Sequence, residues 1–271
     1  MNISDYLARI GVESSARADF PTLRAMQRAH VHAVPFENLD VQLRRPVTLE
    51  TEAIYDKVVR RKRGGWCYEL NGLMGWALEQ LGFEVTRVSA GVAREISGDG
   101  QLGNHLCLLV HLERPYLVDV GFGSSLLEPL PLEVGERIDA PYRVGLAEVG
   151  DGYWRFSERA HGAPFGFDFK PTHADEALLA AKSRLMQTDA GSPFVQNMVA
   201  KRRLGDAYFT LRGRVLTRTD VTGDTKTVLD SAAECVRRLR ELFDLDVPEV
   251  EALWPAICAR HEALFERARE S

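Results

Sequence analysis

Cysteine is scarce in this chain, and the usual spacings of structural cysteines are missing. Four cysteines occur among 271 residues, and no two of them form a C-x-x-C pair. Four is too few for a disulfide scaffold, and the lack of such pairs removes the commonest spacings of zinc and redox sites. We therefore expect free thiols in a reducing cytoplasm.

Long apolar runs and an excess of positive charge are also missing. No hydrophobic run approaches the ~20 residues that a membrane span needs. Residues 1–20 carry acids and no stretch of signal-peptide type, so export is not expected. The formal net charge of −5 gives no reason to expect nucleic acid or an anionic membrane as a partner. Hydrophobic residues at 45% and charged residues at 27% are typical of a globular protein, which we predict to be cytoplasmic.

Hydrophobic periodicity is helical in residues 1–83. Helices are expected over 49–61 and from about Trp66 onward. In the second of these, apolar residues recur at i, i+3, i+4, i+7, i+8 and i+11 from Leu70, which describes one face of a helix. Gly82 stands where a C-terminal cap is expected.

The period changes to two in residues 84–190, where short β-type runs are separated by Gly, Pro or Asp. The runs are EVTRVSAGV, HLCLLVHL, YLVDV, YRVGLAEV and YWRFSER, and their spacing predicts an antiparallel barrel or sandwich. A helix is expected over 173–186. Residues 191–271 add strands in AYFTLRGRVLTRTD and KTVLD, and two terminal helices from Ser231 and Pro248. The whole pattern predicts an α+β protein.

Cys67 lies at the predicted start of the helix that begins near Trp66. Unpaired backbone N–H groups and the helix dipole favour negative charge there, so the position suits a thiolate nucleophile. The preceding Gly64 and Gly65 let the backbone turn sharply and leave room for another molecule to approach. A buried, inert cysteine is the structural alternative, because free cysteine is among the most buried residue types.

A cysteine nucleophile needs a base, and the base needs a group that orients it. His105 lies in the apolar strand NHLCLLVHL, and Asp119 interrupts the apolar strand YLVDV, where an unpaired carboxylate would be costly. His105 and Asp119 lie on the same face of a hairpin if the numbers of any two directly opposed residues add to an even number. The turn around Arg114 must then contain an odd number of residues.

Two other interpretations of these residues remain open at this point. His105 can be a hydrogen-bonded core histidine. A metal site is the other alternative, and its ligands would be Cys67, His105, Cys107 and Asp119. Cys107 is better explained as a core residue of its strand, because the spacing of these residues matches no common metal motif.

Four segments follow one another along the first half of the chain: VPFENLD (34–40), RGGWCYELNGL (63–73), NHLCLLV (104–110) and LVDVGFG (117–123). In order and spacing they resemble the arylamine N-acetyltransferases. The second contains the family's RGG-x-C-x-E-x-N pattern in full. The match extends over roughly residues 1–125 and is weaker beyond, where GSPFVQN (191–197) is the best anchor.

The resemblance implies a triad in which Cys67 is the nucleophile, His105 its base and Asp119 the residue that orients His105. It also implies an N-terminal helical bundle, an antiparallel β-barrel and a C-terminal α/β lid, around a core like that of cysteine proteases and transglutaminases. The corresponding ranges are 1–83, 84–190 and 191–271.

The resemblance further implies the substrates. In the family, the acetyl group of acetyl-CoA moves to the cysteine, and an arylamine, arylhydroxylamine or hydrazine then takes it up, as in xenobiotic metabolism. Acetyl-CoA would be a co-substrate, with no permanently bound cofactor and no metal. Phe36 and Phe122 would border the acceptor pocket, and Gly121 to Gly123 would close over the thioester.

Charged residues near the cysteine are expected to support the site. Arg63 belongs to the glycine motif as well as to the basic run RRKR, so we expect it to pair with an acid, and Glu37 and Glu69 are the candidates. The terminal helices, with apolar Ala256 and Leu264, suit packing against the lid or against a second subunit in a homo-oligomer.

Three other functions would use the same residues. A triad cysteine hydrolase of the transglutaminase type would resolve the acyl-enzyme differently. An amide synthase of the same family would take a carrier-bound acyl chain in place of acetyl-CoA. A non-catalytic relative would act as a binding module, but it should have lost a triad residue, and all three are present. The acetyltransferase, the hydrolase and the amide synthase differ in the acyl donor that acylates Cys67.

Overall fold

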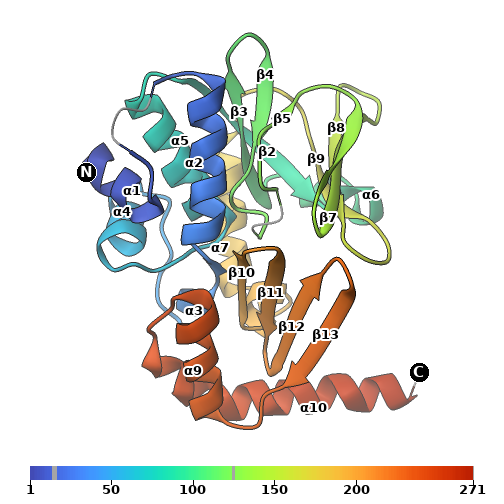
Figure 1. Cartoon of the computed structure of the whole chain (residues 1–271). Helices are drawn as coiled ribbons and strands as arrows, with labels where there is room; N and C mark the ends of the chain where they lie inside the picture. The colour runs from blue at the N-terminus through green and yellow to red at the C-terminus, as the bar shows by residue number, and fades with distance from the viewer. Residues whose placement is uncertain (14–16, 124–125, 271) are drawn as a thin grey trace.

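The computed structural model describes residues 1–13, 17–123 and 126–270 (Figure 1). Its helices are α1 (Ile3–Ile10), α2 (Phe20–Ala33), α3 (Leu39–Gln42), α4 (Thr51–Tyr55), α5 (Cys67–Gln80), α6 (Arg94–Ser97), α7 (Glu176–Thr188), α8 (Pro193–Gln196), α9 (Ala232–Phe243) and α10 (Trp254–Glu270). A π-helical turn, η1 (Asp56–Arg60), extends α4, and η2 (Asp99–Gln101) and η3 (Pro248–Leu253) are 3₁₀ turns.

The strands fall into two sheets. They are β1 (Phe36–Glu37), β2 (Glu84–Val92), β3 (His105–His111), β4 (Pro115–Val118), β5 (Leu130–Pro131), β6 (Gly135–Asp139), β7 (Tyr142–Glu148), β8 (Trp154–Arg159), β9 (Phe165–Phe169), β10 (Val199–Leu204), β11 (Ala207–Arg212), β12 (Val215–Asp220) and β13 (Gly223–Val228).

Helix α5 is the central helix of the N-terminal part. It begins at Cys67, as the apolar period predicts, and Gly82 follows its end with φ of +86°. Leu70, Leu73 and other apolar residues of α5 are fully buried against α1, α2 and one face of β3. The helix that carries the cysteine is therefore held rigidly on the sheet that carries the histidine.

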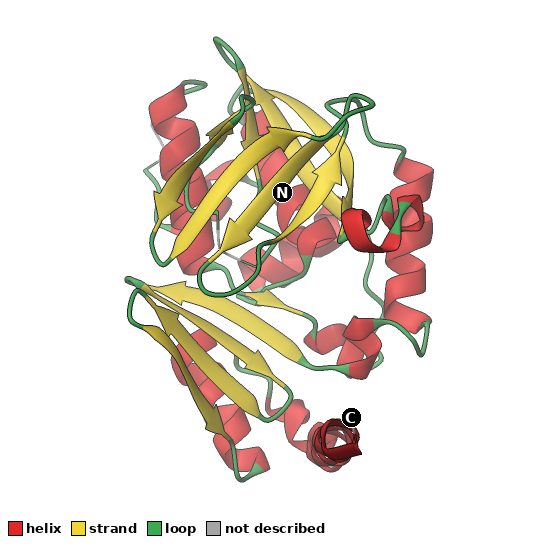
Figure 2. Ribbon diagram, turned by 90° about the vertical axis from the view of Figure 1, so that its right-hand side faces the viewer, coloured by secondary structure: helices red, strands yellow, loops and turns green. Residues whose placement is uncertain are grey.

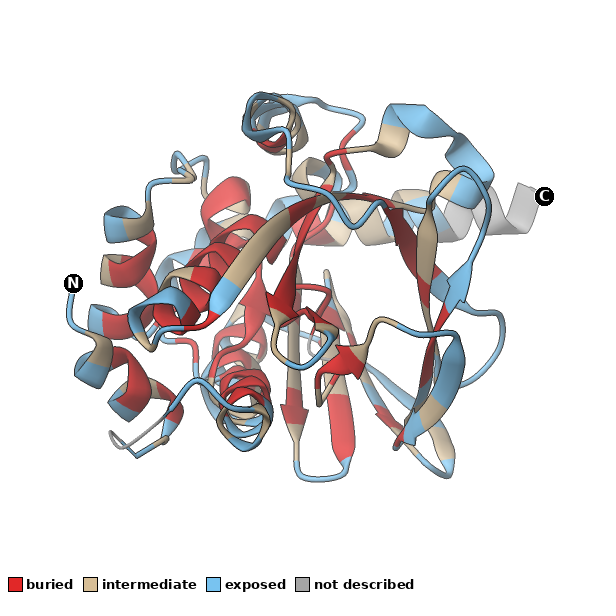
Figure 3. Ribbon diagram, turned by 90° about the horizontal axis from the view of Figure 1, so that it is seen from above, coloured by how far each residue is buried: buried red, intermediate tan, exposed pale blue. Residues whose placement is uncertain are grey.

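Within the described residues, β2 to β9 form an eight-stranded antiparallel sheet in the order β5-β4-β3-β2-β9-β8-β7-β6. Seen in Figures 2 and 3, this sheet curls around a buried interior, and the N-terminal helices cover one side of it. The interior is apolar, with Val88, Cys107, Phe156 and Phe167 in one core cluster. Strands β5 and β6 are the two edges, so the predicted barrel is a curled, open sheet.

The second sheet joins the two ends of the chain. Its order is β1-β10-β11-β12-β13, so a two-residue strand from the N-terminal part, Phe36–Glu37, pairs with Ala200 and Lys201 of a strand far along the chain. One face packs on α9, with Ala200, Leu211 and Leu239 in a shared core cluster. The other face, which carries Thr210, Thr217 and Lys226, borders a cleft against α10, and the curled sheet lies above the second sheet in Figure 1.

The α+β class predicted from the sequence is confirmed, and the helices and strands named there exist with small shifts at their ends. The strand expected over YLVDV ends at Val118, one residue before Asp119. Strands β1, β5, β6, β9 and β10 were not predicted. The domain ranges ending at residues 83 and 190 stay a prediction. No helix among the described residues is long and apolar enough to cross a membrane.

Candidate functional site

Cys67 is the first residue of α5, and its side chain is 4% exposed. The start of the helix is fixed by Glu69, whose Oε2 accepts a hydrogen bond from the Trp66 N–H at 3.2 Å. The Cys67 Sγ lies 4.0 Å from the carbonyl oxygen of Asn104, the residue before His105. The nucleophile candidate therefore lies where the helix N-terminus meets β3.

His105 and Asp119 form a buried pair beside Cys67. The His105 Nε2 lies 2.6 Å from Asp119 Oδ2, and both side chains are almost fully buried. The other ring nitrogen, Nδ1, is not engaged by Asp119, and Cys67 is near enough to His105 to raise its pKa. Burial alone would lower the pKa of His105, but the charge and hydrogen bond of Asp119, together with Cys67, raise it to about 10.

The hairpin register predicted for His105 and Asp119 is confirmed. Leu108 is opposite Val118, and His111 is opposite Pro115, so opposed residue numbers add to an even sum. The turn between the two strands is 112–114, an odd number of residues. His105 and Asp119 consequently lie on the same face of the hairpin, although Asp119 follows the end of β4.

Asn71 holds Asp119 in place. Its Nδ2 donates to Asp119 Oδ1 at 2.8 Å and to the Leu106 carbonyl at 2.6 Å, and its Oδ1 accepts from the Val120 N–H at 2.9 Å. The Gly121 N–H donates to the same Asp119 Oδ1 at 2.7 Å. Asn71 belongs to the glycine–cysteine motif, but sequence reasoning assigned it no role. Its position four residues after Cys67, on the same face of α5, is the signal that indicates one.

Gly121 packs tightly against the backbone of Cys67. A Cβ at this position would lie 2.6 Å from the Cys67 Cα and 2.7 Å from the Asn71 Nδ2. Both neighbours are fixed, one as helix backbone and the other by its hydrogen bonds. The loop predicted to close over the thioester thus begins in direct contact with Cys67.

We expect Gly121→Ala to lower kcat by about 100-fold. The added methyl group must displace Cys67 or Asn71, and moving a catalytic group out of its reactive position lowers the rate by about this factor. The control is Gly100→Ala, where an added Cβ meets nothing within 4 Å. Steady-state rates of both variants, with circular dichroism to verify folding, test this expectation. Equal rates for both variants would contradict it.

The paired glycines of the motif serve the protein's own packing. A Cβ on Gly64 would lie 2.1 Å from the Pro35 carbonyl oxygen, and one on Gly65 would lie 2.7 Å from the Glu69 Oε2. Neither glycine has a positive φ. The expectation that these glycines leave room for another molecule is therefore wrong, because the chain itself occupies that room.

A buried network of charges lies beneath the helix start. Arg63 donates to Glu37 Oε1 at 2.7 Å and to Asp40 at 3.1 Å, so the pairing expected with Glu37 is confirmed. Glu69 is not its partner and binds the Lys57 ammonium instead, at 2.9 Å. Burial alone would lower the pKa of Lys57, but the charges of Glu69, Glu37 and Asp40 raise it. Sequence reasoning missed Lys57 and Asp40.

Lys57→Met should destabilise the protein by about 3–5 kcal/mol, because removal of one partner leaves buried carboxylates uncompensated. Arg61→Met is the control, since its ion pair with Asp56 at 2.8 Å is solvent-exposed, and such pairs contribute up to about 1 kcal/mol. Urea unfolding of both variants gives the two free energies. A similar small loss in both would mean that the network contributes little.

Two groups of aromatic residues flank the triad. The Phe122 ring contacts His105 edge-on, at 5.4 Å between ring centroids, and lies 5.5 Å from Phe165 and 5.1 Å from Phe167. Phe36 lies 6.3 Å from Phe194 and forms a backbone bridge to Gly65, two residues before Cys67. Both phenylalanines predicted to border the acceptor pocket therefore lie near the candidate nucleophile.

Cys107 has the role of a core residue. It is fully buried in the interior of the curled sheet, and its Sγ lies 3.9 Å from the Val88 carbonyl oxygen. Burial raises the pKa of this thiol. Among the residues that the structure describes, no group of three or more His, Cys, Asp or Glu could hold a metal ion.

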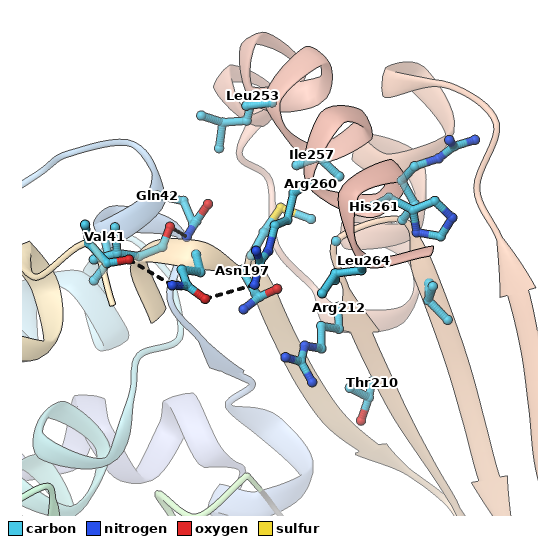
Figure 4. A pocket seen from close by; sticks show the side chains of 18 of the residues that line it. Val41, Gln42, Asn197, Thr210, Arg212, Leu253, Ile257, Arg260, His261 and Leu264 are labelled. Atoms are coloured by element: carbon cyan, nitrogen blue, oxygen red, sulfur yellow. Dashed lines mark hydrogen bonds between the residues drawn. The ribbon is translucent and has the colours of Figure 1, made fainter. Parts of the chain in front are cut away.

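A cleft of about 1180 Å³ separates the second sheet from α10 (Figure 4). Thr210 and Arg212 of β11 line one wall, and Ile257 and Arg260 of α10 line the other. The cations that line it are Arg44, Arg212, Arg214, Lys226 and Arg260, and its described lining includes no Asp or Glu. A cleft with this charge suits a ligand that carries several negative charges.

Comparison with known proteins agrees with this fold. A family model described as N-acetyltransferase matches residues 19–252. The arylamine N-acetyltransferase of Mycolicibacterium smegmatis is 36% identical over 262 residues, which cover 92% of this chain and 94% of the relative.

Solved structures match over nearly the whole chain. The structure of Mycobacterium marinum arylamine N-acetyltransferase in complex with CoA has a TM-score of 0.86 at 32% identity, covering 96% of this chain and 98% of that chain. A Bacillus cereus arylamine N-acetyltransferase, described as having a unique Cys-His-Glu catalytic triad, has a TM-score of 0.80 at 25% identity, covering 91% of this chain and 100% of that chain.

The matched family model and the shared fold define the class of protein, an N-acetyltransferase and hence an acyltransferase. Since a relative that is 36% identical covers 92% of the chain, the chain belongs to the arylamine N-acetyltransferase family. The resemblance drawn from the four sequence segments is thereby confirmed.

Proposed function

We propose that this protein transfers the acetyl group of acetyl-CoA to the nitrogen of an arylamine, arylhydroxylamine or hydrazine through an acetyl-cysteine intermediate on Cys67. The observation that carries the proposal is the buried group of Cys67, His105 and Asp119, in which His105 Nε2 lies 2.6 Å from Asp119 Oδ2 and Cys67 contributes to the raised pKa of His105. Family membership supports the same activity.

The first half-reaction acetylates the enzyme. The raised pKa of His105 favours the imidazolium form, which pairs with a Cys67 thiolate. The thiolate attacks the thioester carbonyl, a new S–C bond forms, and the bond to the coenzyme A sulfur breaks. His105 gives its proton to the departing thiolate. Backbone N–H groups at the start of α5, including that of Cys67, are the candidate donors to the oxyanion.

The second half-reaction transfers the acetyl group to the acceptor. The amine nitrogen attacks the acetyl-cysteine carbonyl, the C–N bond forms and the bond to Cys67 Sγ breaks. His105, now neutral, takes the proton that the nitrogen loses. The enzyme returns to its thiolate–imidazolium pair, and Asp119 keeps Nε2 protonated throughout.

The cationic cleft supports a coenzyme A thioester as the donor. Coenzyme A carries its phosphates far from its sulfur, and Arg212, Lys226 and Arg260 can bind them in the cleft. Thr210 of the cleft wall lies directly opposite Lys201, which contacts Phe36, so the cleft begins one strand away from the aromatic residues at the site. A hydrolase acting on uncharged peptides would not need these cations to bind its substrate.

Initial rates with acetyl-CoA and 4-methylaniline varied together test the proposal. A mechanism that releases coenzyme A before the amine reacts gives parallel lines in the double-reciprocal plot. Intersecting lines would contradict the acetyl-enzyme. Turnover of a carrier-bound acyl thioester, with no turnover of acetyl-CoA, would instead identify an amide synthase of the same family.

A further inference from the structure

Tyr68, the residue after the nucleophile candidate, connects α5 to the segment that carries His105. Its side chain is 1% exposed, and its hydroxyl donates to the Gly103 carbonyl at 2.7 Å. Burial and the charge of Cys67 raise the pKa of Tyr68, so the hydroxyl keeps the proton that it donates. Gly103 is two residues before His105. The residue beside the nucleophile is therefore bonded to a residue close to the base.

A second hydrogen bond from α5 reaches the other side of His105. The Nδ2 of Asn71 donates to the Leu106 carbonyl at 2.6 Å, and Leu106 directly follows His105. Tyr68 and Asn71 are three residues apart, so they are neighbours on the helix surface. We call the Tyr68–Gly103 and Asn71–Leu106 hydrogen bonds the α5–β3 clamp. The clamp holds the backbone on both sides of His105 against the helix of the nucleophile.

The segment held by the clamp also contacts the nucleophile itself. The Cys67 Sγ lies 4.0 Å from the carbonyl oxygen of Asn104, the residue between Gly103 and His105. Cys67 and Tyr68 belong to the same first turn of α5, so the Tyr68 hydroxyl has a fixed place relative to the thiol. Because consecutive Cα atoms are about 3.8 Å apart, a shift of Gly103 must be passed on to His105.

The remaining hydrogen bonds of this segment lead to β2. The Gly103 N–H donates to the Ala90 carbonyl at 3.0 Å, and the Val92 N–H donates to Asn104 Oδ1 at 2.7 Å. They attach the segment to the neighbouring strand of the curled sheet. Its position relative to α5, and hence to the thiol, is set by the clamp.

We propose that Tyr68 is a positioning residue, whose hydroxyl holds His105 at the distance from Cys67 that proton exchange requires. The inference rests on the proposed acetyl transfer and adds a residue to its machinery. Without the hydroxyl, the Gly103 carbonyl would be buried and unpaired, which is unfavourable, so the segment would move to find another donor. His105 would move with it, away from the thiol.

The first test is the activity of Tyr68→Phe, which keeps the ring and removes only the hydroxyl. We expect kcat with acetyl-CoA and 4-methylaniline to fall about 10-fold, a factor that corresponds to the loss of one hydrogen bond. The KM for acetyl-CoA should not change, because the hydroxyl faces the protein and His105 acts in both half-reactions. Steady-state rates give both constants, and circular dichroism verifies folding.

The second test follows the contact between Cys67 and His105 without any substrate. Iodoacetamide alkylates thiolates, and peptide mass measures its rate at Cys67. In wild type the imidazolium maintains the thiolate, so the rates at about pH 6 and about pH 9 should be similar. In Tyr68→Phe the ratio of the rate at pH 9 to that at pH 6 should rise about 10-fold, because a thiolate farther from the imidazolium is protonated more readily.

Tyr55→Phe is the matched control. Tyr55 is also 1% exposed, belongs to the same core cluster as Tyr68, and donates its hydroxyl to the Asn2 carbonyl at 3.0 Å. The substitution therefore removes the same kind of hydrogen bond at a place away from the triad. We expect a similar loss of thermal stability in both variants, but wild-type kcat and a wild-type alkylation profile in Tyr55→Phe.

Three results would overturn the role of Tyr68. They are a wild-type kcat in folded Tyr68→Phe, an alkylation profile that does not change in that variant, and equal changes in Tyr55→Phe. Failure of wild type to form an acetyl adduct would instead overturn the proposed function. Because alkylation needs no acetyl-CoA, it still reports on the contact between Cys67 and His105, so the two failures are distinguishable.

Discussion

Replacement of Cys67 by Ala is expected to lower turnover by on the order of 10⁵-fold or more, to the background rate, because losses of this size follow removal of an enzyme's nucleophile. The side chain is 4% exposed and lies at the start of α5 against β3, so loss of its sulfur should leave the fold intact. Turnover of acetyl-CoA with 4-methylaniline, measured alongside thermal unfolding, tests this expectation.

Cys258→Ala is the matched control for this variant. Cys258 lies on α10, is partly exposed, and is not among the residues that line the cleft. It should retain wild-type turnover. If Cys67→Ala retained turnover close to that of the control, another residue would have to carry the acetyl group.

Asp119→Asn is expected to lower kcat by about 10⁴-fold, as the equivalent change does in triads where the acid fixes the histidine tautomer. Asp119 Oδ1 accepts two hydrogen bonds, from Asn71 Nδ2 and from the Gly121 N–H. The amide oxygen of the new Asn must keep that position, which turns its NH₂ toward His105 Nε2. Nε2 then has to accept, so the proton moves to Nδ1, the nitrogen that should exchange a proton with Cys67.

The pH dependence distinguishes this tautomer effect from simple loss of structure. The charge of Asp119 helps to raise the pKa of His105, so the pKa of His105 should fall in Asp119→Asn. NMR titration of the histidine signals measures that shift, and circular dichroism checks folding. A variant that folds normally, keeps the wild-type histidine titration and loses little kcat would contradict the orienting role of Asp119.

The parts of the fold with a strong apolar period were predictable from sequence. Helix α5 and strand β2 (Glu84–Val92) begin where the pattern places them, because the apolar residues that set the period are buried in the core. The register of the hairpin that carries His105 and Asp119 followed from a single requirement, a shared face for the two side chains. Hydrophobic period and hairpin register both depend on residues that are close together in the sequence.

The missed features depend on contacts between distant segments. Strand β10 contains Lys201, Arg202 and Arg203 in succession, a pattern typical of a solvated surface. In the fold, Arg203 is buried and donates to the Asp139 carbonyl, and Lys201 covers Phe36. No spacing in the sequence reveals these partners, since they come from the other sheet and from the other end of the chain.

The buried charge network beneath the helix start is missed for the same reason. Lys57 lies three residues before the basic run RRKR, near the end of a predicted helix, where charged side chains usually face solvent. Its partners Glu69 and Asp40 come from two other elements. Because Arg63 belongs to a motif, the sequence could predict that it pairs with an acid. It could not show that Glu37 binds Arg63 while Glu69 binds Lys57.

The most direct test of the central claim is the intact mass of the protein after brief exposure to acetyl-CoA without an acceptor. We predict that wild type gains the mass of one acetyl group, that Cys67→Ala gains none, and that 4-methylaniline discharges the adduct. An adduct that forms equally on Cys67→Ala, or a folded wild type that forms none, would contradict an acetyl-cysteine at Cys67.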